Sequence, residues 1–153
     1  MDPKKVMDSI EIGAKESFTK TVTETDVNLF AGITGDFYPL HVDEEFAKKT
    51  QFRSRIAHGS MLVGFISTVM AKMNTNHIPP PGGVSYRYDV KFAGPVMFGD
   101  TITTELTLKE KHPEKNEVIF DALCTNQRGE TVLKGMTIMK LLKDPPFKDP
   151  PLK

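Results

Sequence analysis

A carboxylate and an imidazole stand five positions apart in residues 35–41, which read GDFYPLH. Such a pair, Asp36 and His41, can hold a water molecule and move protons at an adjoining substrate. Gly35 and Pro39 favour a turn between them, so the two side chains would not share one helix, although they could still converge. The structural alternative is that Asp36 caps the next turn while His41 binds a main-chain carbonyl group.

A second cluster, residues 56–60 with the sequence IAHGS, comes directly before an apolar helical pattern. Amides in the first turn of a helix have no partner within the helix, and Gly59 has no Cβ to keep a ligand oxygen away. Gly59 is therefore a candidate oxyanion donor, with an ordinary helix cap as the alternative. Ser67, two turns further on, is either bonded to a preceding carbonyl or a polar contact in a substrate pocket.

The histidines do not predict a metal site. His58, His77 and His112 show no ligand spacing with acidic partners, and the single cysteine, Cys124, excludes a site made of several thiolates.

A long apolar helix begins after Gly59, so its start would position this second cluster. Its apolar residues recur at helical spacing and form a stripe broad enough to be mostly buried: Met61, Leu62, Phe65, Ile66, Val69, Met70 and Met73. Beside it runs a stripe of small residues, Ser60, Gly64, Ser67 and Ala71, where a backbone could approach closely. Gly64 costs a helix about 1 kcal/mol relative to alanine, which suggests a packing or ligand-binding reason.

In four segments after the helix, apolar and polar residues alternate, as they do in strands with one solvent-exposed face. They cover residues 84–92, 102–108, 118–124 and 132–142, and residues 16–22 form a shorter first strand. Successive antiparallel strands beside one long helix predict an α+β fold in which the sheet wraps around the helix.

A short helix is expected between the first strand and the polar cluster. Thr23 and Asp26 form a weak capping box that would open it, with Val27, Phe30 and Ile33 facing inward.

The composition fits a single domain. The chain has 153 residues and 20 basic residues against 20 acidic ones, so no overall charge attracts nucleic acid or an anionic membrane. One cysteine and an N-terminus without an apolar signal segment favour the cytoplasm. We expect a domain over residues 1–143 and a proline-rich tail over residues 144–153, whose removal should change stability and activity little.

Residues 30–43, FAGITGDFYPLHVD, together with Phe46-Ala47 and residues 55–59, RIAHG, resemble the hydratase-2 motif of the MaoC-like (R)-specific enoyl-CoA hydratases. Residues 92–96, FAGPV, and the following Gly99-Asp100 resemble the strand and loop after the central helix in that family. The resemblance extends over about residues 12–142. It implies a hot-dog fold, a homodimer or larger assembly, and reversible hydration of a trans-2-enoyl-CoA or acyl-carrier-protein thioester to the (R)-3-hydroxyacyl product.

The resemblance also implies roles for single residues. Asp36 and His41 fall on the catalytic pair, Gly59 on the amide donor to the thioester carbonyl, and Ser67 on a serine near the acyl chain. Tyr38 and Leu40 are further predicted substrate contacts. No metal and no cofactor are implied, since CoA is part of the substrate.

Two positions depart from the family pattern: Tyr38 stands where asparagine is usual, and Glu44 where proline is usual. The first departure leaves the acyl chain length open. Two other functions remain as alternatives, a hot-dog thioesterase that directs water at the carbonyl carbon, and an acyl-thioester-binding protein without catalysis.

Overall fold

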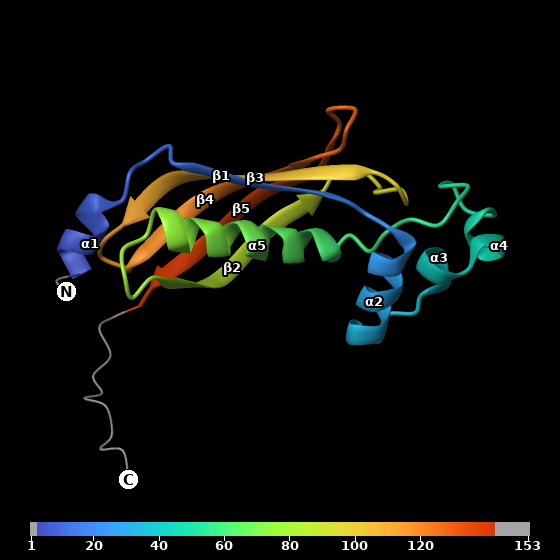
Figure 1. Cartoon of the computed structure of the whole chain (residues 1–153), viewed down its shortest axis with the longest axis horizontal. Helices are drawn as coiled ribbons and strands as arrows, with labels where there is room; N and C mark the ends of the chain where they lie inside the picture. Colours follow the sequence, from blue (N-terminus) through green and yellow to red (C-terminus); the bar gives the residue numbers. More distant parts are fainter. Residues whose placement is uncertain (1–2, 143–153) are drawn as a thin grey trace, which may run out of the picture.

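Five antiparallel strands form one sheet in the order β1-β3-β4-β5-β2 (Figure 1). The strands are β1 (Lys15–Thr21), β2 (Gly83–Phe92), β3 (Thr101–His112), β4 (Glu117–Thr125) and β5 (Thr131–Leu141). The structure is a computed structural model that describes residues 3–142. The tail predicted for residues 144–153, with its boundary after residue 143, lies outside the described residues.

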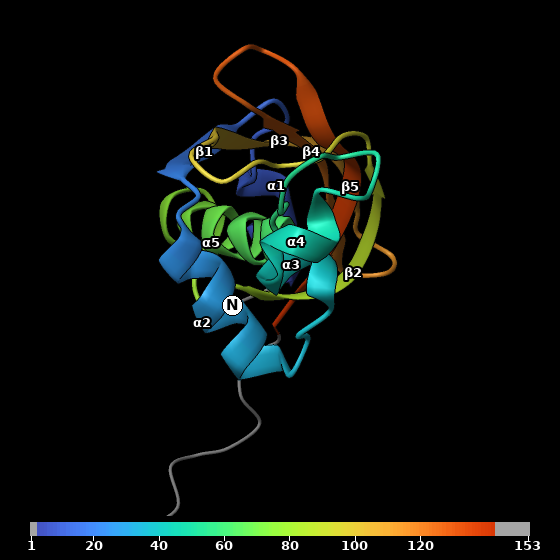
Figure 2. The same ribbon diagram turned by 90° about the vertical axis from the view of Figure 1, so that its right-hand side faces the viewer.

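The long helix α5 (Met61–Asn76) lies along the inner face of the sheet, whose strands form an arc around it in Figure 2. Every residue of the predicted apolar stripe is buried, which confirms that prediction. The stripe packs on side chains from the sheet such as Leu106 and Phe120, and together they form one hydrophobic core. An antiparallel sheet wrapped around one helix is the expected α+β hot-dog arrangement.

The predicted alternation is confirmed most clearly in β3, where Ile102, Thr104, Leu106 and Leu108 are all buried. Strand β2 departs from its predicted pattern. A β-bulge between Ser85 and Arg87 changes the register against β5, so Tyr88 and Val90 pack against the core while Val84 and Tyr86 stay about half exposed. A bulge adds one residue to a strand, and the side chains before and after it then no longer share one alternation.

Helix α2 (Glu24–Thr34) begins at the predicted capping box, with Thr23 and Asp26 each bonded to the other's main-chain N–H. Val27 is buried as expected, but Ile33 is 84% exposed, so its inward placement was wrong. Figure 1 gives the reason: α2 runs away from the sheet, and its last turn lies beyond the core. Gly35 then ends the helix in the left-handed conformation with φ 78°.

Three short helices were not predicted. Helix α1 (Pro3–Ser9) covers the end of the core opposite α2, and Lys111 Nζ holds it by donating to the carbonyl groups of Met7 and Ile10. Helices α3 (Pro39–Val42) and α4 (Glu44–Ala47) follow α2. Each is too short to show a helical period in its sequence. Within residues 3–142, no helix is both long and apolar enough to cross a membrane.

Candidate functional site

The first polar cluster lies at the end of the molecule where α2, α3 and α4 gather around the start of α5 (Figure 2). Asp36 follows the left-handed Gly35 directly, and Pro39 opens α3 two residues after Phe37. Asp36 makes local bonds: its N–H donates to Thr34 Oγ1 at 3.3 Å, and its Oδ1 accepts the N–H of Tyr38 at 3.2 Å. The second carboxylate oxygen, Oδ2, makes no such bond to any residue between 3 and 142, and the side chain is 49% exposed.

His41 sits in the single turn of α3 with its ring tied to the chain ahead of α5. Its Nδ1 is 2.8 Å from the carbonyl oxygen of Ile56. A carbonyl oxygen only accepts, so Nδ1 carries the hydrogen, and in the neutral ring Nε2 keeps a free lone pair. Asp36 thus caps the next turn and His41 binds a main-chain carbonyl group, as the non-catalytic alternative predicts. These two contacts use only one oxygen of Asp36 and one nitrogen of His41.

His58 is the residue of the site that sequence reasoning missed. It is 2% exposed, its Nε2 lies 2.9 Å from the main-chain oxygen of Asp36, and the same nitrogen is 3.9 Å from Asp36 Oδ2. Its ring stacks on His41 with centroids 3.9 Å apart and planes at 30°. The sequence shows no ligand spacing between His58 and an acidic residue, but the turn at Gly35 and the loop before α5 bring His58 beside Asp36, 22 positions away.

Asp36, His41 and His58 each offer one ligand atom, and these atoms lie within 4.8 Å of one another. Two of the ring nitrogens, His41 Nδ1 and His58 Nε2, face carbonyl oxygens and so carry hydrogen. This leaves the carboxylate and His41 Nε2 as accessible ligands, fewer than the three protein ligands of a typical catalytic zinc site. The cluster is better suited to proton transfer than to holding a metal, and the absence of a metal site stays a prediction.

A cavity of about 380 Å³ opens beside His41. Its wall is mostly apolar and comes from the loop before α5, the first turn of α5, and the end of β2 with the loop after it. The lining residues are His41, Phe52, Ile56, Ala57, Gly59, Leu62, Phe92, Ala93, Gly94, Pro95 and Val96.

Gly59, the predicted oxyanion donor, lines this cavity just before the first turn of α5. No described residue accepts a hydrogen bond from its N–H. A Cβ at this position would lie 3.1 Å from Cδ1 of Phe92, which is closer than side chains normally approach. The glycine therefore leaves room between α5 and β2 as well as a free amide.

The three predicted substrate contacts lie elsewhere. Tyr38 is exposed, and its ring makes T-shaped contacts with the rings of His41 and Phe46 at centroid distances of 6.1 and 5.9 Å. Leu40 is half-buried, and its carbonyl accepts the N–H of Ile56 at 3.4 Å. Ser67 is exposed on the small-residue stripe of α5, and no atom comes within 4 Å of a Cβ built on the neighbouring Gly64. Within the described chain none of the three lines the cavity, and nothing makes the predicted close approach at Gly64.

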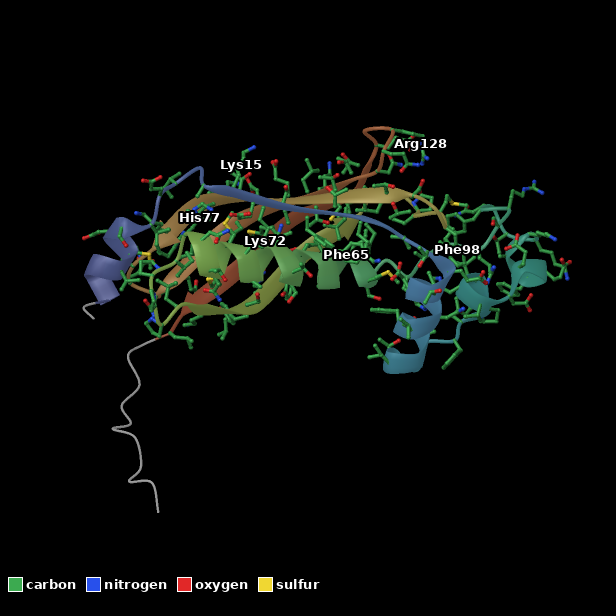
Figure 3. The ribbon with its side chains drawn as sticks, viewed as in Figure 1. Lys15, Phe65, Lys72, His77, Phe98 and Arg128 are labelled. Atoms are coloured by element: carbon green, nitrogen blue, oxygen red, sulfur yellow. The ribbon has the colours of Figure 1, made fainter. Side chains whose placement is uncertain are left out.

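Arg55 fastens the loop before α5 to two of the site helices. Its guanidinium binds Glu24 of α2 at 2.7 Å and Glu44 of α4 at 3.3 Å, and it lies 4.8 Å from the ring centroid of Phe98. Figure 3 shows Phe98 at this end of the molecule, far from His77. Glu44, which departs from the family pattern, thus has a partner of its own in this chain.

A buried carboxylate supports the cavity wall from behind. Asp100 is 3% exposed and accepts hydrogen bonds from Met97 N–H, Gln127 and Arg128 at 2.8–2.9 Å. Burial alone would raise the pKa of Asp100, but these hydrogen bonds and the Arg128 charge outweigh it and lower the pKa. Arg128 reaches Asp100 from the turn between β4 and β5, visible above the sheet in Figure 3. Asp100 thereby joins that turn to the loop between β2 and β3.

The chain's one thiol takes no part in this site. Cys124 is buried in the core on β4, and Thr104 Oγ1 lies 3.3 Å from its sulfur. Burial raises the pKa of the Cys124 thiol, which keeps it protonated and poorly nucleophilic.

Comparison with known proteins shows the family to which this chain belongs. Residues 8–126 match the family described as the MaoC like domain. An (R)-specific enoyl-CoA hydratase of Rhodospirillum rubrum is 40% identical over 128 residues, which cover 84% of this chain and 85% of the relative. A 3-hydroxybutyryl-CoA dehydratase of Methylorubrum extorquens is 35% identical, with 89% of this chain and 83% of the relative covered. The solved structure of an (R)-hydratase from A. caviae involved in PHA biosynthesis matches with a TM-score of 0.76 and 28% identity, covering 88% of this chain and 98% of that one. These matches extend well beyond the polar motif, and the chain belongs to the MaoC-like domain family.

Proposed function

We propose that this protein is a lyase that adds water reversibly to a trans-2-enoyl thioester and forms the (R)-3-hydroxyacyl thioester. The observation that carries the proposal is the free Oδ2 of Asp36 and the free Nε2 of His41, with the amide of Gly59 in the wall of the cavity beside that ring. The named activities of the relatives in Rhodospirillum rubrum and Methylorubrum extorquens are the two directions of this chemistry.

In this mechanism Asp36 and His41 hold one water between their free acceptor atoms. The pair takes a proton from the water as its oxygen bonds to C3 of the enoyl group, and a proton is returned to C2. Between these two events negative charge builds on the thioester oxygen, where the N–H of Gly59 donates a hydrogen bond, and the charge is discharged when C2 takes up the proton. Water is the only co-reactant and no electrons leave the substrate, so the step needs no redox cofactor.

The apolar wall of the cavity suits an acyl chain, and the substrate is an acyl-CoA or acyl-carrier-protein thioester. Ser67 is kept as a substrate contact on the ground of the family resemblance, and Tyr38 and Leu40 are kept because they flank the catalytic pair in the sequence. The balance of 20 basic and 20 acidic residues favours neither nucleic acid nor a membrane as a partner. With one buried cysteine, the protein suits a reducing cytoplasm.

The protein acts as a homodimer that pairs through the edge strand β2. The other edge, β1, is polar and bears residues such as Lys15 and Lys20, whereas β2 exposes Val84, Tyr86 and Phe92, each about half. An exposed apolar edge favours pairing with another strand. Phe37 and Ile33, close to Asp36 in the sequence, are also exposed apolar side chains that a second subunit would cover.

The direct test is an assay of the purified protein with crotonyl-CoA and a medium-chain trans-2-enoyl-CoA. Loss of the enoyl absorbance, with (R)-3-hydroxyacyl-CoA identified by chiral analysis, is the expected result. Release of free CoA thiol without hydration would establish the thioesterase alternative instead. Binding of both compounds without either reaction would establish the non-catalytic alternative, and an (S) product would contradict the proposed stereochemistry.

A further inference from the structure

We propose that His58 is a positioning residue for this reaction, one that holds Asp36 through its main chain and His41 through its ring. The inference rests on the proposed hydration activity. His58 itself need not touch the substrate, because it is buried and does not line the cavity.

The first contact anchors the loop that carries Asp36. Among the described residues, the hydrogen bonds of residues 35–38 run to partners between Ala31 and His41, with one exception. The exception is the bond from His58 Nε2 to the carbonyl of Asp36 at 2.9 Å. A half-exposed loop held only by local bonds can shift as a unit, so this single bond sets where the carboxylate stands relative to α5.

The second contact sets the plane of the His41 ring. The bond from Nδ1 to Ile56 fixes one atom of that ring, but the ring can still turn about the bond. Stacking on His58 at 3.9 Å removes this freedom and thereby aims Nε2. Phe30 of α2 packs on His58 in turn, with centroids 4.9 Å apart, so His58 cannot easily move away.

A histidine at position 58 is less favourable for packing than an apolar ring would be. Its Nε2 carries hydrogen toward the Asp36 carbonyl, so Nδ1 is an acceptor, and this atom is buried with no partner among the described residues. A buried polar atom without a hydrogen bond disfavours the folded state. An apolar ring of similar size would avoid this penalty, which points to a role in activity rather than in stability.

The test compares two substitutions that separate the two contacts. His58→Phe keeps a stacking ring and removes the donor, and kcat for crotonyl-CoA hydration should fall about 10- to 100-fold with little change in KM, because a small misplacement of reacting groups costs that much. His58→Gln keeps an N–H donor of similar reach and should recover most of the loss. His112→Phe, an identical change at the far end of β3, should leave kcat at the wild-type value.

A purely structural role would give a different pattern. We expect the melting temperature of His58→Phe to equal or exceed that of wild type, and its affinity for the saturated analogue butyryl-CoA to be unchanged. A fall in kcat that follows a fall in melting temperature and in butyryl-CoA affinity would overturn the proposal, and so would wild-type kcat in His58→Phe. If His58→Phe does not fold, His58→Gln decides: a small fall in kcat from the lost stacking ring, at unchanged butyryl-CoA affinity, supports the proposal, and wild-type kcat or a loss as large as that of Asp36→Asn contradicts it.

A double mutant shows whether His58 acts through Asp36. In Asp36→Asn the base is already lost, so adding His58→Phe should reduce kcat by much less than it does in wild type. Losses that multiply would mean that the two residues act independently, against the proposal. Wild-type protein without hydratase activity would instead refute the proposed function, before His58 is tested at all.

Discussion

His41 donates its Nδ1 hydrogen to the carbonyl oxygen of Ile56 at 2.8 Å, and this bond makes Nε2 the basic atom of the ring. The ring is therefore anchored by one nitrogen and reactive through the other, an arrangement typical of histidines that transfer protons. Ile56 also lines the cavity, so the anchor and the substrate share one short segment of chain.

The first prediction separates these two nitrogens. His41→Asn places an amide N–H near the position of Nδ1 and can keep the bond to Ile56, but it has no group that takes up a proton. We expect hydration to fall by roughly two to four orders of magnitude, the usual contribution of a positioned acid or base, while the melting temperature stays within a few degrees. Hydration rates and thermal melts of the purified variant check this; an active variant would show that His41 serves only as an anchor.

Asp36→Asn tests the carboxylate in the same way. The amide keeps the size of the side chain and can still accept the N–H of Tyr38, but it removes the negative charge from the position of Oδ2. Activity should fall by roughly 10²- to 10⁴-fold with butyryl-CoA binding retained. Combined with His41→Asn, the loss should be far smaller than the product of the two, because both groups act on one water. Multiplied losses would point to separate steps.

The strands and the central helix could be predicted because each follows one simple period. In residues 102–108 buried and partly exposed side chains alternate, as the pleat of a strand requires. The apolar stripe from Met61 to Met73 follows the 3.6-residue period of a helix. The inward placement of Ile33 was predicted wrongly because its spacing fits the helix period, whereas the last turn of the helix lies beyond the core. Val84 and Tyr86 were wrongly placed on the same face as Tyr88 because a β-bulge shifts the register of β2. A bulge cannot be recognised from the alternation of the sequence.

The sequence predicts candidate reacting groups, but it does not show what surrounds them. Asp36, His41 and Gly59 were recognisable from residue type and motif, whereas the placing of His58 beside Asp36 depends on how a loop closes over 22 residues. The cavity wall at Phe92 to Val96 was seen only as part of the family resemblance. Its signal in the sequence is an apolar strand end running into Gly94-Pro95, which must turn away from the sheet.

Gly59→Ala tests the space between α5 and β2. The added Cβ would stand 3.1 Å from Phe92 Cδ1 and 3.2 Å from its Cε1, and the half-exposed Phe92 ring would move aside at the cavity wall. We expect kcat/KM to fall about 10-fold or more, since the cavity narrows beside the amide, with little loss of stability. Gly64→Ala on the same helix meets nothing within 4 Å and should keep full activity while the unfolding free energy rises by about 0.5–1 kcal/mol. Equal activity of both variants would argue against the assigned position of Gly59.

A charged residue on the edge strand β2 tests whether two subunits pair through this strand. Val84→Glu places a carboxylate opposite Lys140 within the chain, which the single subunit tolerates, but in a symmetric pairing of two β2 strands it brings two like charges together. Light scattering after size exclusion should show dimeric wild type and a monomeric or weakly associating variant. Thr19→Glu on the β1 edge is the control and should remain dimeric. Monomeric wild type, or dissociation by Thr19→Glu alone, would contradict pairing through β2.

The last prediction concerns the buried carboxylate behind the cavity. In the folded protein, hydrogen bonds from Gln127, Met97 N–H and Arg128 overcome the effect of burial and lower the pKa of Asp100, whereas in the unfolded chain the pKa is about 3.9. Asp100 therefore stabilises the fold at pH values above about 4, and this contribution is lost as the pH falls through the lower folded-state pKa.

Asp100→Asn should reduce the unfolding free energy by about 1.5–3 kcal/mol at pH 7, the range for hydrogen bonds to a charged group. In urea titrations from pH 7 downward, the difference between wild type and Asp100→Asn should be constant at neutral pH and shrink below about pH 4. Asp121→Asn, which removes an exposed carboxylate paired with Lys109, should change stability by less than about 1 kcal/mol. A difference for Asp100→Asn that grows toward acid pH would mean that burial, not the three hydrogen bonds, dominates at this carboxylate, and that the loop behind the cavity is held by other contacts.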